Sequence, residues 1–124
     1  MKKALFCLAA GMLLASTSIA GEKKLMHCFA FTVIDTATPA DWDAFYKATD
    51  DLPKKIKGLS HVWYGKLASP LNQSNGKRTF GVCMEMDNAD VRKKYADDPA
   101  HEAWNAAYAK VHVDGTTTFD ILGQ

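Results

Sequence analysis

The chain alternates between stretches whose apolar residues recur at every second position and stretches where they recur every three or four. Residues 25–34 (LMHCFAFTVI) are apolar, aromatic and β-branched, which is typical of a strand. One face of this strand carries Leu25, His27, Phe29, Phe31 and Val33, and the other carries Met26, Cys28, Ala30, Thr32 and Ile34. Neither face carries a charge, so we expect both to be buried, the bulkier one beneath helices and the smaller one against a second sheet.

A helix is predicted to follow, with Thr38 as the N-cap and Pro39 in the first helical position. Core-type residues then recur at helical spacing, which predicts a helix of about four turns with one face on the core. These residues are Trp42, Phe45, Thr49, Leu52 and Ile56. We expect Pro53 to kink the helix or end it early, and Gly58 to mark its end.

Two strands joined by a loop are predicted next. Residues 60–68 and 78–86 are rich in aromatic and β-branched side chains and therefore typical of strands. Residues 69–77 contain Pro, Asn, Ser and Gly, which predict a hairpin-type loop.

Two short helices and a final strand complete the chain. Asn88 is expected to cap the first helix, which ends near Tyr95. Asp98 as a cap, followed by proline in the first helical position, predicts the second helix over residues 99–111. Residues 116–122 (TTTFDIL) are typical of a strand.

The predicted order is therefore β-α-β-β-α-β with a split second helix, an α+β arrangement. It predicts a ferredoxin-like protomer, in which a four-stranded antiparallel sheet carries its helices on one face. The other face is left open and carries small apolar residues such as Cys28 and Ala30. A second sheet is the simplest cover for such a face, so we expect a homodimer that pairs through it.

The first residues are typical of a signal peptide. Met1-Lys2-Lys3 is basic, residues 4–15 are apolar, and Ser18-Ile19-Ala20 has the small residues of a cleavage site. We therefore predict a signal peptide over residues 1–20 and one domain over residues 21–124, in a periplasmic or secreted protein. The apolar core of the peptide is too short to span a membrane, and no membrane association is expected after cleavage.

Charge argues against a nucleic-acid partner. The whole chain has a net charge of +1, and removal of Lys2 and Lys3 leaves 13 basic against 14 acidic residues, a net charge of −1. No basic stripe is present in the sequence, so neither nucleic acid nor an anionic membrane is an expected partner.

Two cysteines, Cys28 and Cys83, remain after the predicted cleavage, and both fall in predicted strands. We expect buried free thiols that act as small apolar groups. A Cys28–Cys83 disulfide is the alternative, because an exported protein can keep one.

The candidate catalytic residues are Tyr95 and His101, which flank the break between the two short helices. An imidazole near a helix N-terminus is favoured in its neutral form and can act as a base, and a neutral phenol can protonate or hold an oxyanion. The alternative is structural: His101 bonds Tyr95 or the backbone and fixes the helix junction. The sequence leaves both open.

His27 and several aromatic residues are candidates for lining a ligand pocket beneath Tyr95 and His101. The candidate walls are Phe29, Phe45, Trp104 and Tyr108, together with Trp42. Each could equally be an ordinary core residue. The four histidines are scattered without HxxxH or CxxC spacing, so neither a metal site nor a cofactor is expected.

Several short motifs, taken in order, make the domain resemble the stress-responsive A/B barrel family, or Dabb domain. They are His27-Cys28-Phe29-Ala30-Phe31, Leu52 with Ile56-Lys57-Gly58-Leu59, Trp63-Tyr64-Gly65-Lys66, Tyr95 with Asp98-Pro99-Ala100-His101, and Phe119-Asp120. The resemblance implies ferredoxin-like protomers whose sheets pack face to face into a dimeric α/β barrel.

The resemblance also points to particular residues. In plant polyketide cyclases of this family, the tyrosine and the second histidine of a Y-x-x-H-P-x-H stretch act as acid and base. Those positions fall on Tyr95 and His101, and the family's first-strand histidine falls on His27. The departure is Asp98, where the family usually has histidine, which changes the local charge.

Three functions are consistent with these observations. The first is an exported homodimer with a small apolar pocket, which binds a small apolar or aromatic molecule or serves a stress response without assured catalysis. The second is an acid–base enzyme, similar to a polyketide cyclase, that uses Tyr95 and His101. The third is a cofactor-independent monooxygenase or haem-binding relative on the same barrel.

Overall fold

The structure, a computed structural model, describes residues 22–124, and the predicted signal peptide lies outside the described residues. The elements follow in the order β1 (Leu25–Val33), α1 (Pro39–Lys55), β2 (Leu59–Gln73), β3 (Gly76–Met86), α2 (Ala89–Tyr95), α3 (Pro99–Tyr108) and β4 (His112–Leu122). This is the predicted β-α-β-β-α-β order with a split second helix. None of the helices within residues 22–124 is long and apolar enough to span a membrane.

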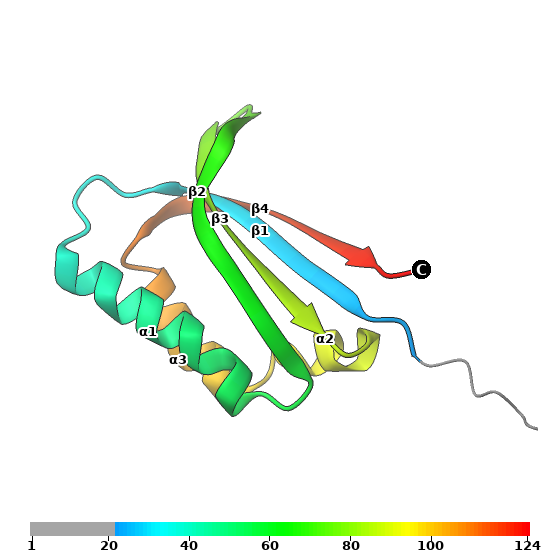
Figure 1. Ribbon diagram of the computed structural model, residues 1–124. Helices are drawn as coiled ribbons and strands as arrows, with labels where there is room; N and C mark the ends of the chain where they lie inside the picture. Colours follow the sequence, from blue (N-terminus) through cyan, green and yellow to red (C-terminus); the bar gives the residue numbers. More distant parts are fainter. Residues whose placement is uncertain (1–21) are drawn as a thin grey trace, which may run out of the picture.

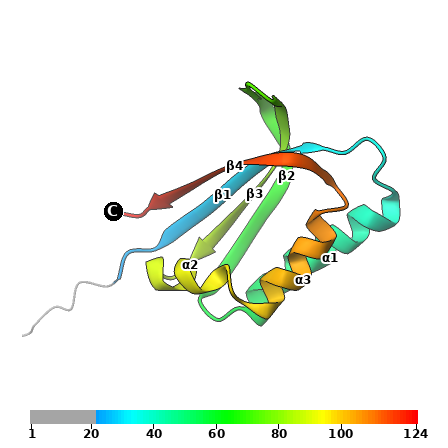
Figure 2. The same cartoon turned by 180° about the vertical axis from the view of Figure 1, so that it is seen from behind.

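The strands form one antiparallel sheet in the order β2-β3-β1-β4. Figures 1 and 2 show the three helices on one side of this sheet, while the opposite side is uncovered. The order of the strands and the one-sided helices are those of a ferredoxin-like fold, so the predicted α+β class is confirmed.

Aromatic side chains fill the core between the sheet and the two longer helices. Phe31 of β1 is completely inaccessible, and its ring centroid lies 5.9 Å from that of Phe45 on α1 and 5.0 Å from that of Tyr108 on α3. Trp104 Nε1 donates a buried hydrogen bond of 2.9 Å to Thr49 Oγ1. Both helices are therefore tied to each other and to β1.

The helices begin at the predicted capping residues. Thr38 Oγ1 accepts from the Asp41 N–H at 3.2 Å, and the Asp41 carboxylate accepts from the Thr38 N–H at 2.9 Å, which completes a capping box. Asp98 Oδ1 accepts from the Ala100 N–H at 2.8 Å and caps α3. Pro53 lies in the last turn of α1 and does not end it early.

The prediction of a loop over residues 69–77 is wrong. β2 continues to Gln73 and β3 starts at Gly76, so the two strands form an arm that rises on the side away from the helices (Figure 1). Gly76 has a φ of +123°, a backbone conformation that glycine adopts readily in a tight turn after Asn75.

A wide bulge interrupts β2 at the base of this arm. Residues 67–70 of β2 stand opposite Thr79 alone on β3, so the two strands separate there before pairing resumes. Pro70 within the bulge has no N–H to give to a ladder, which fits its place outside the regular pairing.

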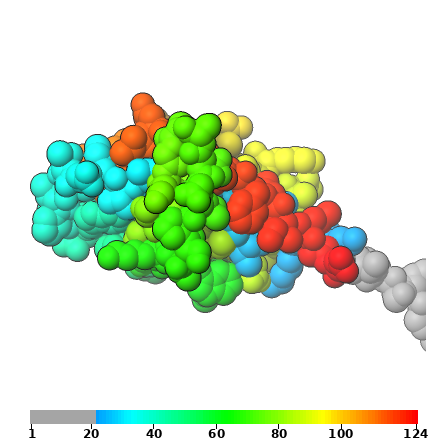
Figure 3. All heavy atoms as spheres, turned by 90° about the horizontal axis from the view of Figure 1, so that it is seen from above, coloured from blue at the N-terminus to red at the C-terminus, as the bar shows by residue number. Residues whose placement is uncertain are grey.

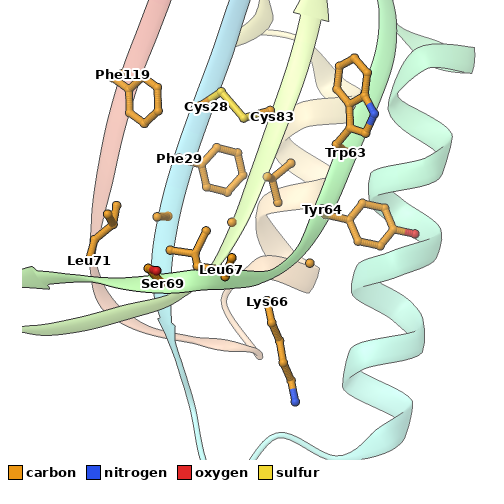
Figure 4. A pocket seen from close by; sticks show the side chains of 15 residues that line it. Cys28, Phe29, Trp63, Tyr64, Lys66, Leu67, Ser69, Leu71, Cys83 and Phe119 are labelled. Atoms are coloured by element: carbon orange, nitrogen blue, oxygen red, sulfur yellow. A yellow bond between two sulfur atoms is a disulfide. The ribbon is translucent and has the colours of Figure 1, made fainter.

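The two cysteines form a disulfide, so the expectation of free thiols is wrong. Cys28 of β1 and Cys83 of β3 stand directly opposite each other, with Cα atoms 4.1 Å apart. Such close spacing is typical of the narrower pairs of an antiparallel ladder, where side chains approach one another. The bond lies on the uncovered face of the sheet (Figure 4).

Candidate functional site

A cavity of about 220 Å³ brings His27, Tyr95 and His101 together between β1, β4 and the α2–α3 break. We call it the histidine pocket. Its lining consists of His27, Phe29, Tyr95, His101, Trp104, Asn105, Tyr108, Thr116 and Thr118. Thr116 and Thr118 are exposed on the edge strand β4, so the pocket opens toward solvent along that edge.

The local sequence explains how three distant residues meet. His27 lies on the helix-covered face of β1, Tyr95 ends α2, and His101 follows the Asp98 cap in the first turn of α3. The Tyr95 ring centroid is 4.2 Å from that of His101 and 5.7 Å from that of His27. The phenol ring therefore packs against both imidazoles.

The Tyr95 hydroxyl is buried and has no hydrogen-bond partner among residues 22–124. The side chain is only 3% exposed and lines the histidine pocket. Burial raises the pKa of Tyr95 well above its usual range, so the phenol keeps its proton at neutral pH. A buried hydroxyl without a partner is costly, which makes it a ready donor for a molecule that enters the pocket.

His27 is held by an acidic partner. Its Nδ1 lies 2.5 Å from Asp120 Oδ1, and Arg92 Nε donates to the other carboxylate oxygen at 3.1 Å. Because the carboxylate is an acceptor, Nδ1 carries the proton of the neutral ring, and Nε2 is the basic nitrogen. Burial lowers the pKa of His27 despite the opposing effect of its hydrogen bond to Asp120, so the neutral ring is favoured.

His101 is oriented by the backbone of the helix junction. Its Nδ1 lies 3.2 Å from the Ala96 carbonyl oxygen, so Nδ1 donates and Nε2 is again the basic nitrogen. This contact matches the structural alternative for His101, while its place in the pocket lining matches the chemical one. The two are compatible, because the same bond that fixes the junction sets the ring orientation.

Three of the five aromatic walls that the sequence predicted line the pocket. Phe29, Trp104 and Tyr108 do so, and the Tyr108 hydroxyl lies 2.6 Å from Thr116 Oγ1 at the rim. Burial raises the pKa of Tyr108 to about 12. The expectation for Phe45 is wrong, because its fully buried ring is part of the core. Trp42 does not line this pocket either.

Sequence reasoning assigned no role to Asp120 and Arg92, although Asp120 was part of a family motif. Asp120 is the one acidic residue of the predicted last strand and stands directly opposite His27 in the β1–β4 register. The predicted topology places these two strands side by side, but the His27–Asp120 pair also depends on their register, which the order of strands does not fix. Arg92 reaches Asp120 from α2, a tertiary contact that no sequence spacing reveals.

The pocket offers proton chemistry. One protonated phenol and two imidazoles with basic Nε2 atoms can donate to and accept from a single small molecule. Within residues 22–124, no cluster of three or more His, Cys, Asp or Glu side chains is placed to hold a metal ion.

Known proteins share this fold over most of their length. A dimeric ferredoxin-like protein of unknown function from Thermobifida fusca is 25% identical, with a TM-score of 0.63 over 82% of this chain and 92% of that one. A Dabb family protein from Mesorhizobium loti is 18% identical, with a TM-score of 0.64 over 83% and 99%. A hydroxynitrile lyase from Passiflora edulis is 8% identical, with a TM-score of 0.66 over 82% and 94%.

No curated protein sequence matches the chain. The family model of the stress responsive A/B barrel domain matches residues 25–122, which includes all four strands and the whole histidine pocket. The chain therefore belongs to the stress-responsive A/B barrel (Dabb) family.

Proposed function

We propose that the protein is an exported homodimer whose histidine pocket binds a small hydroxyl- or carbonyl-bearing molecule and acts on it by acid–base chemistry. The observation that carries this proposal is Tyr95, whose side chain lines the pocket and whose buried hydroxyl has no partner within residues 22–124. A ligand oxygen would satisfy it. The volume of the histidine pocket, about 220 Å³, is below the usual 300–1,000 Å³ of ligand sites, which favours a small ligand.

The roles follow from the protonation states. Tyr95 donates its hydrogen bond to the ligand oxygen and stabilises negative charge that develops there. His101 Nε2 takes a proton from the ligand, since its Nδ1 is occupied by the Ala96 carbonyl. His27, held neutral and oriented by Asp120, gives the ligand a second hydrogen-bond partner.

Catalysis on this scaffold has a precedent among the similar structures. The Passiflora edulis protein is a hydroxynitrile lyase, and cleavage of a hydroxynitrile requires removal of a hydroxyl proton. The plant polyketide cyclases that the Tyr95–His101 stretch resembles also transfer protons. We therefore place the activity among lyases and cyclases that need a base and a phenol. A stress-response role through ligand binding alone is the second candidate.

Pairing through the uncovered sheet face is supported by its side chains. Trp63, Cys83, Cys28 and Phe119 follow one another in register across all four strands. Trp63 and Phe119 are about half exposed, and Figure 3 views β4 and the arm from the side that no helix covers. Similar proteins from Thermobifida fusca and Bacteroides fragilis are dimeric. Burial of these aromatic residues would stabilise a dimer.

The proposal is tested with mandelonitrile, a small hydroxynitrile, and phenol, a non-reactive hydroxyl compound. We expect phenol to shift the NMR signals of His27 and His101, and mandelonitrile to be cleaved faster than in buffer. Tyr95→Phe is expected to weaken phenol binding, and His101→Ala to abolish cleavage while the melting temperature barely changes. Asn72→Ala, which removes an exposed amide outside the pocket lining, is the control.

Different outcomes separate the two candidate functions. Phenol binding without mandelonitrile cleavage would favour the ligand-binding function over the lyase-like one. Phenol binding that is unchanged in Tyr95→Phe, or a large loss of stability in His101→Ala, would contradict the proposal and favour a purely structural junction.

A further inference from the structure

A second pocket, of about 540 Å³, lies between α1 and the bulge at the base of the β2–β3 arm. We call it the bulge pocket. Its lining consists of Val33, Trp42, Tyr46, Lys66, Leu67, Pro70, Thr79 and Phe80. None of these residues lines the histidine pocket. We propose that the bulge pocket binds an aromatic organic anion, with the ring against Trp42 and Phe80 and the carboxylate or sulfonate paired with Lys66.

The backbone opens this pocket. Four residues of β2 stand opposite Thr79 alone, so the two strands separate beside the Lys66–Phe80 pair. Leu67 and Pro70, both within the bulge, become walls. Strand bulges change the direction in which side chains project, and they occur often beside functional sites. The bulge thus provides space at a position where a regular ladder would leave none.

Aromatic rings form the floor of the bulge pocket. The Trp42 ring centroid lies 5.2 Å from that of Phe80 and 5.6 Å from that of Tyr46. Trp42 and Tyr46 are both half-buried, so each keeps one part of its ring accessible from the pocket. A planar aromatic ligand can bury that area and adopt offset or edge-on contacts with the rings.

The charge of Lys66 favours an anionic ligand in the bulge pocket. Lys66 is the one charged side chain in the lining, and it forms no ion pair within residues 22–124. Figure 4 shows its ammonium directed away from Trp63, Phe119 and the disulfide. Tyr64 bonds Asp50 of α1, so alternation along β2 directs Lys66 to the same side, where it lines the bulge pocket. Lys66 also borders the hollow on the uncovered face that Figure 4 shows. An apolar body with one anionic group complements such a lining.

The test uses 2-naphthoate with the full domain, followed by NMR shifts of the backbone amides. We expect binding to shift the signals of Trp42, Thr79 and Phe80. Lys66→Met is expected to weaken binding about two- to fivefold, the range for an exposed ion pair. Lys77→Met is the matched control, because Lys77 is an exposed lysine of the same arm outside the pocket lining. It should leave the affinity unchanged.

A neutral analogue separates the contribution of the Lys66 charge from that of the aromatic contact with Trp42. Binding of 2-naphthalenemethanol, which has the ring without the charge, should be insensitive to Lys66→Met and weakened by Trp42→Leu. Trp42→Phe replaces that variant if Trp42→Leu lowers the melting temperature strongly.

Several results would overturn the proposal. These are no naphthoate binding, equal affinity in Lys66→Met and wild type, or shifts confined to Trp63 and Phe119. Dissociation of a dimer by naphthoate would also overturn it, because the bulge pocket would then be a subunit contact.

Discussion

The two faces of the sheet carry different kinds of chemistry, although alternate residues of the same strand supply both. On the helix-covered face, β1 contributes His27 to a pocket with titratable groups. On the uncovered face, the next residue, Cys28, joins β3 through a disulfide flanked by half-exposed aromatic rings (Figure 4). The first face holds an unsatisfied polar atom inside a packed core, while the second leaves apolar area in water. Each departs from an ordinary protein interior or surface, and in our proposal a ligand completes the first face and a second copy of the chain completes the other.

The largest expected effect is a loss of folding stability that distinguishes the core residue Phe31 from Phe119 on the uncovered face. Phe31→Ala should lower the free energy of unfolding by about 3–5 kcal/mol, because a fully buried ring is replaced by a cavity. Phe119→Ala should lower it by less than about 1.5 kcal/mol, since Phe119 is 47% exposed, but should weaken the proposed dimer. Urea denaturation and analytical ultracentrifugation measure the two quantities. Equal losses of stability would show that the uncovered face is also core.

Removal of the disulfide is expected to destabilise the fold nearly as much as Phe31→Ala. Its cysteines are 55 residues apart, and removal of such a loop constraint costs about 2–4 kcal/mol. The double variant Cys28→Ala/Cys83→Ala should show this loss in urea denaturation, and wild type treated with a reductant should match it. An unchanged midpoint in both samples would mean that the bond contributes nothing to stability.

A pair of tyrosines tests the unsatisfied hydroxyl. Tyr108→Phe should lower the free energy of unfolding by about 1 kcal/mol, because it removes the bond to Thr116. Tyr95→Phe should leave it unchanged or raise it by up to about 1 kcal/mol, since its hydroxyl has no partner within residues 22–124. Thermal and urea denaturation of the two variants provide the comparison. A loss in Tyr95→Phe as large as that in Tyr108→Phe would contradict the assignment.

The smallest effect concerns pH. Burial lowers the pKa of His27 in the folded protein, so the unfolded chain binds more protons below its ordinary value of about 6.5. The stability that neutral His27 contributes is present above that value and is lost as the pH falls through the folded pKa. The loss is at most about 1.4 kcal/mol per pH unit for one group. Urea denaturation at pH 7.5 and 5.5 should show a smaller decrease for His27→Gln than for wild type.

Local patterns predicted much of this molecule. The alternation along β1 assigned its two faces, and the caps at Thr38 and Asp98 fixed two helix starts, because these features depend on neighbouring residues alone. The arm was missed because Pro70, Asn72 and the Asn75-Gly76 turn are typical of loops. Only the pairing of residues 71–73 with β3 extends β2 beyond the bulge that holds Pro70. Strand pairing is a long-range property, which overrides local preference.

The same limit applies to the sites. Tyr95 and His101 could be singled out because they flank one helix junction, while Phe45 was misplaced because helical spacing shows only that a residue faces the core. The disulfide and the Asp120 partner of His27 both depend on register, which the order of strands does not fix. The bulge pocket depends on a local interruption of that register.

The disulfide also fixes which residues of β1 point to each face of the sheet. A slip of β1 by a single residue would exchange its faces, turning His27 and Phe29 outward and Cys28 and Ala30 toward the helices. A covalent bond between Cys28 and Cys83 excludes every such offset between β1 and β3. The Cys28–Cys83 disulfide on the uncovered face therefore also keeps the His27 imidazole on the helix-covered face.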